Sequence, residues 1–396
     1  MQTIKDVQLQ GKTVLLRVDF NIPMNKDGTI IDDSKMKAAL PTLEYILNQG
    51  ARVIVMSHLG RPKGRPDSQY SMKPLAGHLQ SLVKNRVIMA TDSIGPAVQE
   101  AVSKLQPGEI LLLENLRFYK EEEQNDPNHA QQLADLADIF VNDAFGAAHR
   151  AHASTVGVAD YLPAYAGLLM EQEVKMLRQV LDHPESPRMA ILGGAKVADK
   201  LGLIGNLINK MDILLIAGGM GNTFIKAQGH SIGKSMHEAD RLEEAAQLLQ
   251  TARERDVKIL LPIDVVAADA ISADAAWGIY PVDSIPDDKM IVDIGPQTIE
   301  IFCAAIRTAR TIIWNGPLGV YEYEQFARGT WEAARAIAES PAVSVIGGGD
   351  SAAAVQNLGL EKDITHISTG GGATLEFLEG RTLPGVAVAE RAEVLP

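Results

Sequence analysis

The chain runs VSVIGGGDS from Val343 to Ser351, an apolar stretch followed by three glycines, an aspartate and a serine. A run of Val and Ile without alternating polar residues is typical of a parallel strand that is covered on both faces. Glycines after such a strand permit a tight turn into a helix. The same order recurs after Met189–Leu192 and after Asp212–Ala217, each followed by two glycines. The pattern predicts an α/β fold built on parallel sheets.

Short apolar strands alternate with longer amphipathic stretches along the whole chain. The expected strands are Thr13–Phe20, Arg52–Ser57, Arg86–Ala90, Glu109–Glu114, Asp138–Asn142, Met189–Leu192, Asp212–Ala217, Lys258–Pro262, Met290–Asp293, Thr311–Trp314, Val343–Ile346 and Ile364–Ser368. The expected helices include Lys35–Asn48, Lys73–Lys84, Ala97–Leu105, Asn128–Ala137, Val197–Lys210, Arg241–Arg255 and Phe326–Glu339. Twelve strands are too many for one compact domain in a chain of this length. We therefore expect two doubly wound parallel-sheet domains joined by a helix, with an interdomain cleft.

A polar, proline-containing break is the expected boundary between the two domains. A helical stretch from Glu171 to Leu181 runs into DHPESP at residues 182–187, and a new strand begins at Met189. Proline and polar residues of this kind end helices and form linkers. We therefore expect a first domain at residues 1–170, a linker helix and hinge at 171–187, and a second domain at 188–380.

Composition narrows the class of protein. Of the 396 residues, 46% are hydrophobic and 22% charged, which is typical of a folded globular protein. A transmembrane helix and a signal peptide are not expected, so the predicted location is the cytoplasm. The net charge of −13 argues against sequence-independent nucleic-acid binding. Cys303 is the only cysteine, which excludes an intramolecular disulfide and a thiolate-rich metal site.

Basic and polar side chains follow successive strands in the first half of the chain. Residues 1–170 hold 17 basic and 19 acidic side chains, whereas residues 171–396 hold 20 and 31, so an anion site is expected in the first half. The stretches concerned are Arg17–Asn21, Ser57–Lys63, Asn115–Arg117 and Asn142–His152. No single stretch of this kind indicates a binding site, but the carboxyl ends of parallel strands share one edge of a sheet. Together they predict a basic pocket for an anion that carries a phosphate and a carboxylate.

Glycine-rich loops follow the strands of the second half. They are Gly193–Lys196, Gly218–Gly221, Gly347–Ser351 and Gly370–Gly372. Glycines let backbone N–H groups approach an anion, so four such loops in one domain predict a phosphate-rich ligand. Neither a P-loop nor a Gly-x-Gly-x-x-Gly motif fits: the stretch 229–235 is one residue too short and follows no clear strand.

Two anion sites on two domains indicate phosphoryl transfer, which depends on positioning, charge neutralisation and magnesium. Asp350 is the expected carboxylate for the metal. Lys196 and Lys200 are four residues apart and are expected to share one helix face.

The order and spacing of these motifs resemble phosphoglycerate kinases over nearly the whole chain. The motifs are RVDFNIP (17–23), SHLGRP (57–62), LENLRF (113–118), NDAFG (142–146) with HRAH (149–152), GGAKVADK (193–200), WNGPLGVYE (314–322) and GGGDS (347–351). The resemblance implies a monomeric glycolytic enzyme that reversibly transfers a phosphoryl group between 1,3-bisphosphoglycerate and ADP. The products are 3-phosphoglycerate and ATP, the nucleotide acts with Mg²⁺, and the two domains close about a hinge.

The resemblance also implies which residues do this. For 3-phosphoglycerate they are Asp19, Phe20, Asn21, Lys35, His58, Leu59, Gly60, Arg61, Arg117 and Arg150. For the nucleotide they are Gly194, Ala195, Lys196, Lys200, Gly218, Gly219, Asn315, Pro317, Glu322, Gly348, Gly349, Asp350 and Ser351, with Asp350 near magnesium. The expected catalytic residues are Lys35, Lys196, Lys200, Gly371 and Gly372. Residues from about 381 to 396 are expected to pack back on the first domain.

Lys35 departs from the family pattern, which has an arginine at this position. Lysine keeps the charge but lacks the planar pair of donors, so reduced turnover is expected. Two alternatives remain: a kinase of the same fold that acts on another carboxylate, and a nucleotide-binding member that has lost catalysis. A purely structural role would not require arginines and triglycine loops at successive strand ends.

Overall fold

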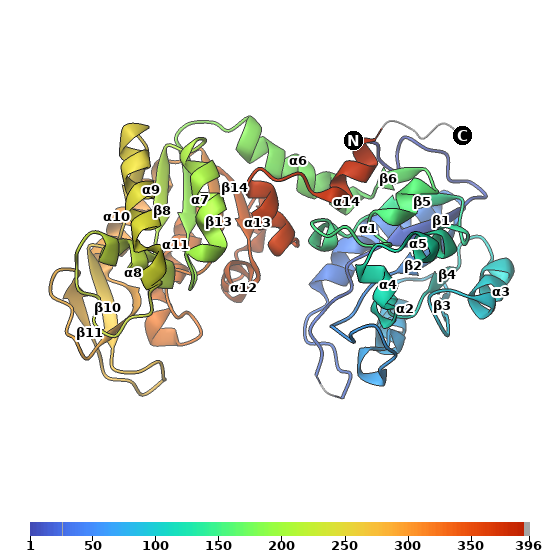
Figure 1. The fold of residues 1–396 in the computed structure, drawn as a ribbon, viewed down its shortest axis with the longest axis horizontal. Helices are drawn as coiled ribbons and strands as arrows, with labels where there is room; N and C mark the ends of the chain where they lie inside the picture. Colours follow the sequence, from blue (N-terminus) through green and yellow to red (C-terminus); the bar gives the residue numbers. More distant parts are fainter. Residues whose placement is uncertain (26, 392–396) are drawn as a thin grey trace. The chain divides into compact units, whose positions relative to one another are not determined.

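The computed structural model describes residues 1–25 and 27–391 of the chain, which divide into two compact units. The first unit comprises Met1–Val174 and the segment from Thr382 onward, and the second comprises Lys175–Arg381. Helix α6 (Leu168–Asp182) runs from the first unit into the second (Figure 1). In the described part of the chain, no helix is both long and apolar enough to span a membrane.

A six-stranded parallel sheet forms the centre of the first unit. Its strands are β1 (Thr13–Arg17), β2 (Arg52–Met56), β3 (Val87–Met89), β4 (Ile110–Leu112), β5 (Ile139–Asn142) and β6 (Ala164–Ala166). Their order is β3-β4-β2-β1-β5-β6, and every neighbouring pair is parallel. Its helices are α1 (Ser34–Asn48), α2 (Lys73–Leu82), α3 (Pro96–Lys104), α4 (Lys120–Glu123), α5 (Pro127–Ala134) and α14 (Pro384–Ala387).

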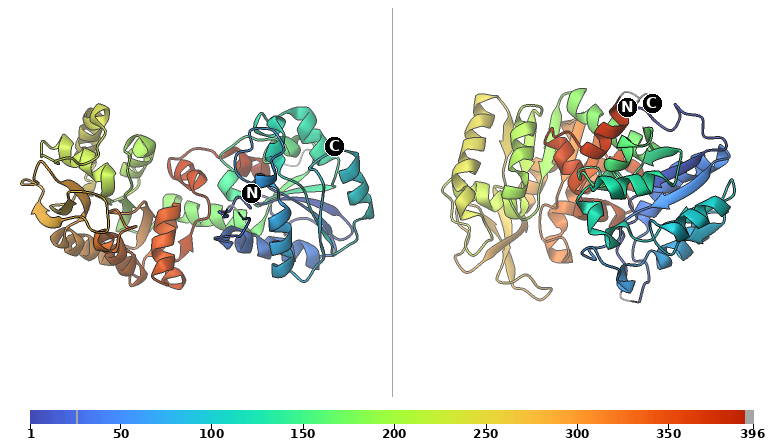
Figure 2. Two further views of the ribbon diagram at one scale, coloured as in Figure 1. Left: turned by 90° about the horizontal axis from the view of Figure 1, so that it is seen from below. Right: turned by 45° about the vertical axis from the view of Figure 1, so that its right-hand side comes forward.

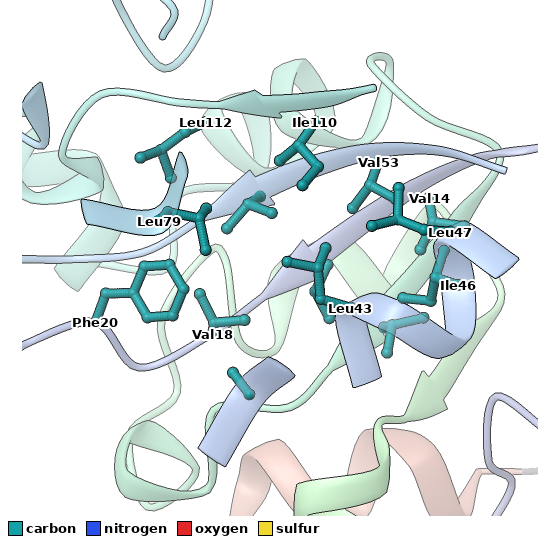
Figure 3. Packing of buried hydrophobic residues seen from close by; sticks show 14 of the residues in the cluster. Val14, Val18, Phe20, Leu43, Ile46, Leu47, Val53, Leu79, Ile110 and Leu112 are labelled. Atoms are coloured by element: carbon teal, nitrogen blue, oxygen red, sulfur yellow. The ribbon is translucent and has the colours of Figure 1, made fainter. Parts of the chain in front are cut away.

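Both faces of this sheet are buried, which explains the continuous apolar runs in the sequence. Val14 and Val53 face a core to which α1 and α2 contribute Leu43 and Leu79 (Figure 3). On the other face, Leu15 belongs to a second cluster that draws on α3 and α5. Successive strand residues point to opposite faces, so a strand between two helical layers needs apolar residues at every position.

The second unit is built on another six-stranded parallel sheet. Its strands are β7 (Arg188–Leu192), β8 (Ile213–Ile216), β9 (Lys258–Leu260), β13 (Thr311–Asn315), β14 (Val343–Gly347) and β15 (His366–Ile367). Their order is β15-β14-β13-β7-β8-β9. The remaining helices are α7 (Leu201–Ile208), α8 (Gly218–Ala227), α9 (Leu242–Glu254), α10 (Pro296–Thr308), α11 (Arg328–Ala338), α12 (Gly349–Asn357) and α13 (Gly372–Leu378). The prediction of two parallel α/β sheets is confirmed.

A three-stranded antiparallel sheet is the feature that the sequence reasoning missed. It consists of β10 (Asp264–Ala268), β11 (Trp277–Pro281) and β12 (Met290–Ile294), in the order β11-β10-β12. It lies in the yellow-to-orange part of the second unit (Figure 2). The expected parallel strand at Met290–Asp293 is therefore wrong in its pairing. β11 alternates exposed and half-buried residues, so it lacks the continuous apolar run by which the other strands were found.

Several predicted elements differ from the observed ones at their ends. The first strand ends at Arg17 rather than Phe20, because residues 18–21 leave the sheet as a loop. The predicted helix Val197–Lys210 is divided: a 3₁₀ turn spans Ala198–Lys200 and α7 begins at Leu201. In the loop between β1 and α1, Met24 and Ile30 form an isolated antiparallel bridge that the sequence reasoning did not predict as a strand.

Candidate functional site

The loops after β1 and β2 bring a buried arginine and a histidine into contact. Arg17 is the last residue of β1 and is only 1% exposed. Its Nη2 lies 3.0 Å from Nδ1 of His58, and its Nε donates to Oγ of Ser154 over 2.8 Å. His58 follows β2 and is 5% exposed. The adjacent carboxyl ends of the two strands place these groups together, because β1 and β2 pair in parallel.

Four basic side chains surround His58. Burial lowers the pKa of His58 well below its ordinary value, and the positive charges of Arg17, Arg117, Lys35 and Arg150 lower it further. The imidazole is therefore neutral at physiological pH. These cations come from β1, α1 and the loops after β4 and β5, so the topology gathers them at one edge of the sheet as predicted.

Lys35 and the residues after β1 form a second part of this site. Lys35 Nζ donates to Asp19 Oδ2 over 2.9 Å and lies 3.5 Å from the backbone oxygen of Asn21. Asn21 Oδ1 accepts from the backbone N–H of Gly60 over 2.9 Å. These bonds fix the loop after β1 against the loop after β2.

Arg117 and Asn115 hold the same loop from the other side. Arg117 Nη1 donates to the backbone oxygen of Gly60 over 2.8 Å, and its Nε lies 3.3 Å from Glu123 Oε1. Asn115 bonds both backbone groups of Leu59, at 3.2 Å through Oδ1 and 2.7 Å through Nδ2. Asn115 is fully buried, so its amide sets the course of the loop.

The other residues expected in this part of the site differ in exposure. Arg150 Nε lies 3.1 Å from His149 Nε2, and Arg61 is exposed. The side chains of Phe20 and Leu59 belong to the hydrophobic core, so only their backbone can face a ligand. The sequence reasoning included Arg17 among the basic stretches of the predicted pocket but did not assign it a role as a site residue.

In the second unit, Lys200 joins the glycine-rich loop after β7 to the end of β13. Its Nζ donates to the backbone oxygens of Gly193, at 2.5 Å, and Asn315, at 3.2 Å. Ser351 Oγ accepts from the backbone N–H of Gly316 over 2.7 Å, which ties the loop after β13 to α12. These contacts bring the ends of β7, β13 and β14 together, as their order in the sheet requires.

Backbone packs directly on backbone where these loops meet. Gly194 N–H donates to Pro317 O and Met220 N–H donates to Gly194 O, both over 2.9 Å. A Cβ on Gly193 would lie 2.0 Å from the oxygen of Pro317, and one on Gly219 would lie 2.9 Å from that of Ala195. Glycine is required there by packing inside the protein.

Asn315 offers a donor in this region. Its Nδ2 is buried and has no hydrogen-bond partner in the described part of the chain. A Cβ on Gly348 would lie 3.1 Å from this Nδ2, so the amide lies beside the glycine loop after β14. Buried polar groups are nearly always hydrogen-bonded, and an acceptor on a ligand would satisfy this one.

Lys196 and Lys200 do not share a helix face, and that expectation is wrong. Lys196 lies outside any helix and is exposed, whereas Lys200 ends a 3₁₀ turn and is buried. The backbone N–H groups of Val197 and Ala198 donate to Glu238 Oε2 over 2.5 and 2.9 Å. This carboxylate accepts from the first N–H groups of a helical turn that begins only after Lys196, so helical spacing does not apply between Lys196 and Lys200.

The chemistry of Asp350 fits a magnesium ion that is held mainly by phosphates. Asp350 is exposed at the start of α12, and Tyr321 Oη lies 3.5 Å from its Oδ1. Among the described residues, no three His, Cys, Asp or Glu side chains gather as a metal site. Mg²⁺ commonly binds through one carboxylate together with substrate phosphates and water, so a single carboxylate suffices.

Comparison with known proteins identifies the family. The family model described as phosphoglycerate kinase matches residues 4–381. A phosphoglycerate kinase of Pelotomaculum thermopropionicum is 56% identical over 385 residues, covering 97% of this chain and 98% of that protein. The chain belongs to the phosphoglycerate kinase family. The enzyme of Moorella thermoacetica is 54% identical over 384 residues, with coverage of 97% and 98%.

Solved phosphoglycerate kinases share the fold. The structure from Coxiella burnetii has a TM-score of 0.89 at 41% identity, and that from Pyrococcus horikoshii has 0.83 at 35%. Each comparison covers 98% of both chains. This chain is therefore a phosphotransferase of the phosphoglycerate kinase class.

Three residues that the resemblance assigns to ligand binding have side chains that are not engaged by the rest of the described protein. Within the described residues, the side chains of Arg61, Lys196 and Glu322 are exposed and make no hydrogen bond. Gly371 has a φ of +52° just before α13, and a Cβ there would meet no atom within 4 Å. Gly372, the first residue of α13, is also exposed.

Proposed function

We propose that this protein catalyses the reversible, magnesium-dependent transfer of a phosphoryl group between 1,3-bisphosphoglycerate and ADP. The products are 3-phosphoglycerate and ATP. The observation that carries the proposal is the set of Lys35, Arg117 and Arg150 around the neutral ring of His58, which also contacts the buried Arg17. Several fixed cations at one sheet edge suit a small acid that bears both a phosphate and a carboxylate.

The first unit would hold 3-phosphoglycerate through its cations and through the polar residues after β1. Arg61 and Arg150 can donate to phosphate or carboxylate oxygens, and His58 can donate one further hydrogen bond. Asp19 and Asn21 lie beside Lys35, where they can accept from a hydroxyl group of the acid. Fixed donors of this kind orient the acid so that its carboxyl group can be phosphorylated.

The second unit would hold the nucleotide along its glycine-rich loops. Gly348 and Gly349 leave backbone N–H groups near α12 accessible to phosphates. The exposed Lys196 can neutralise charge on the moving phosphoryl group, and Asp350 would hold magnesium. The metal would neutralise phosphate oxygens when it is bound with the nucleotide. Lys200 already bonds Gly193 and Asn315, which supports a role in shaping the loops as well as binding phosphate.

We further propose that the first unit, with residues 1–170 and the segment from about 381, binds the acid, and that residues 188–380 bind the nucleotide. Residues 171–187 would form a hinge that closes when both ligands are present and excludes water from the acyl phosphate. The division of the chain within α6 supports this proposal. As the family resemblance implies, the enzyme would act as a cytoplasmic monomer.

Lys35 is proposed to work with reduced efficiency where the family has an arginine. Its ammonium group is a point charge that already contacts Asp19, so it has fewer directed donors left for the substrate than a guanidinium would have. The rest of the cationic site is present around it, which supports reduced rather than absent turnover.

A coupled assay with 3-phosphoglycerate, ATP and magnesium tests the proposed function. We expect steady formation of ADP that depends on all three reactants. A panel of other carboxylic acids distinguishes a kinase of different substrate preference. Absence of ATP formation from 1,3-bisphosphoglycerate and ADP, with retained ADP binding, would instead identify a nucleotide-binding member that has lost catalysis.

A further inference from the structure

Arg17 is a buried cation whose role the proposed reaction leaves unexplained. It is too deeply buried to bind a ligand itself. Burial lowers its pKa from the ordinary value, while the charges of Glu122 and Asp19 oppose that shift. A buried charge is costly unless it is paired and hydrogen-bonded, so a specific arrangement must compensate it.

The contact between Arg17 and His58 determines where the imidazole carries its hydrogen. A guanidinium group has only donors, so Nδ1 of His58, 3.0 Å from Arg17 Nη2, must accept and carries no hydrogen. A neutral ring with a bare Nδ1 has its hydrogen on Nε2. Within the described residues, Nε2 of His58 has no hydrogen-bond partner, and the residue keeps a small exposed area. That N–H is therefore available to a ligand.

Glu122 holds Arg17 in this position through Ser154. Ser154 Oγ accepts from Arg17 Nε at 2.8 Å and donates to Glu122 Oε1 at 2.6 Å. The backbone N–H of Ser154 donates to Glu122 Oε2 over 3.0 Å. Ser154 and Glu122 are both fully buried. The Ser154 hydroxyl thus links the buried carboxylate of Glu122 to the guanidinium group of Arg17. The backbone oxygen of Val18 also accepts a hydrogen bond from Arg17 Nη1.

We propose that Arg17 is a positioning residue that fixes His58 as the Nε2–H tautomer, and that Glu122 keeps Arg17 in place through Ser154. The fixed Nε2–H then donates to a phosphate or carboxylate oxygen of the bound acid. This inference rests on the proposed function for the identity of the acid. It gives a positioning role to Arg17, Ser154 and Glu122, none of which contacts substrate.

Protonation of His58 is opposed from every side that faces it. A hydrogen on Nδ1 would point at a donor of Arg17, and Lys35, Arg117 and Arg150 add positive charge from α1 and two loops. His58 therefore stays a neutral donor over the range in which an ordinary histidine titrates. The affinity for the acid should therefore not rise as the pH falls through the range in which histidine titrates, because His58 gains no positive charge.

Nitrogen-15 NMR of the ligand-free protein, labelled at its histidine rings, tests the tautomer directly. The His58 signals are identified by their loss in a His58→Gln variant. We expect the Nε2–H form alone, without titration between about pH 5 and 8. An Nδ1–H ring, a mixture of tautomers, or titration near the ordinary histidine pKa would overturn the proposal. The spectrum does not depend on which acid the enzyme uses.

Ser154→Ala tests the link from Glu122 to Arg17. We expect His58 to show both tautomers in this variant. KM for 3-phosphoglycerate should rise about tenfold, the equivalent of one hydrogen bond to a charged group, with a smaller change in kcat. Glu122→Gln, which keeps the shape of the side chain but removes its charge, should move the spectrum in the same direction. A spectrum and a KM unchanged in both variants would contradict the proposal.

Ser93→Ala is the matched control. Ser93 is also a fully buried serine of the first unit, but its Oγ makes no hydrogen bond within the described residues. We expect it to leave the His58 spectrum and the KM unchanged. Failure of the proposed function would appear as absent activity in the unaltered enzyme, whereas failure of this inference would appear in the spectrum of the free protein.

Discussion

Lys35 stands where the family resemblance implies an arginine, so replacing it tests the proposed role of this position directly. We expect Lys35→Arg to raise kcat about fivefold, because a guanidinium can add one directed hydrogen bond to a charged oxygen while still pairing with Asp19. Steady-state rates at saturating 3-phosphoglycerate and ATP measure this. Lys37→Arg is a suitable control, since Lys37 lies on the same helix, is exposed and pairs with Asp33. An unchanged or lower kcat would show that the arginine role does not apply at this position.

Asp143 couples folding to pH. Burial raises its pKa to about 6. Its Oδ1 accepts from Met170 N–H over 3.0 Å, while its Oδ2 has no partner within the described residues. The folded state therefore keeps a proton that the unfolded chain loses near pH 4, so stability falls as the pH rises from about 4 to 6. The total loss is at most about 3 kcal/mol.

Asp143→Asn should remove this dependence, because the amide stays neutral and can still accept from Met170. Urea denaturation at pH 4.5 and 7.5 measures the effect. Between these two pH values, the unfolding free energy of the variant should rise relative to that of the unaltered protein by about 2 kcal/mol. Asp135→Asn, at an exposed aspartate of the same unit, should leave the pH dependence as it is. Equal pH slopes for Asp143→Asn and the unaltered protein would refute the assignment.

Individual residues also show the limit of reasoning from sequence. Motif order assigned Asp19, Asn21 and His58 to one site, and the structure brings them to neighbouring loops of one sheet edge. It did not reveal that Arg17 is buried or that Ser154 and Glu122 support it. Arg17 and Ser154 are 137 positions apart and Ser154 and Glu122 are 32 apart, and contacts at such separations are not encoded in any local pattern.

At the scale of elements, the glycines of the second unit fall into two groups with different physical causes. Gly193 and Gly219 are required by neighbouring backbone atoms of the protein itself. A Cβ on Gly349 would meet no atom within 4 Å, and its backbone is not left-handed. A glycine without such an internal reason, at the start of a helix, is suited to close approach by a ligand.

Two alanine substitutions should separate these causes. Gly193→Ala should destabilise the protein by about 2 kcal/mol or more, because the new methyl group would overlap Pro317 O. Gly349→Ala should retain or slightly increase stability, since alanine favours helix, yet weaken ADP binding about tenfold. Thermal denaturation and calorimetric titration with ADP measure the two effects. Retained ADP affinity in folded Gly349→Ala would assign that glycine no role at the nucleotide.

Strands were predicted well where the sequence carries a continuous apolar run, including the partly exposed β3 and β9, and were missed where it does not. The central strands β1 and β13 carry continuous apolar runs and were found, with errors only at their ends. β6 has only three residues, and β11 has one exposed face, so neither has such a run. Lys196 shows the same limit for helices, because the helical turn begins only after it, where Glu238 accepts from the first N–H groups.

The whole molecule combines two units that each hold only part of the required chemistry. The cations gather in the first unit and the glycine loops in the second, and the chain passes between them within α6 and again between Arg381 and Thr382. Neither unit contains both proposed binding regions. In the proposed reaction the bound ligands must therefore be brought together, which the proposed hinge near residues 171–187 would do.

Small-angle X-ray scattering tests this closure. With 3-phosphoglycerate and a non-hydrolysable ATP analogue together, we expect a smaller radius of gyration than in the free protein. Either ligand alone should give a smaller change, because each fills only one of the two proposed regions and cannot link the units. Identical curves under all four conditions, at concentrations that saturate both ligands, would exclude ligand-driven closure. In that event the acyl phosphate would have to be protected from water by side chains already in place, and Lys35→Arg would alter turnover without any change in scattering.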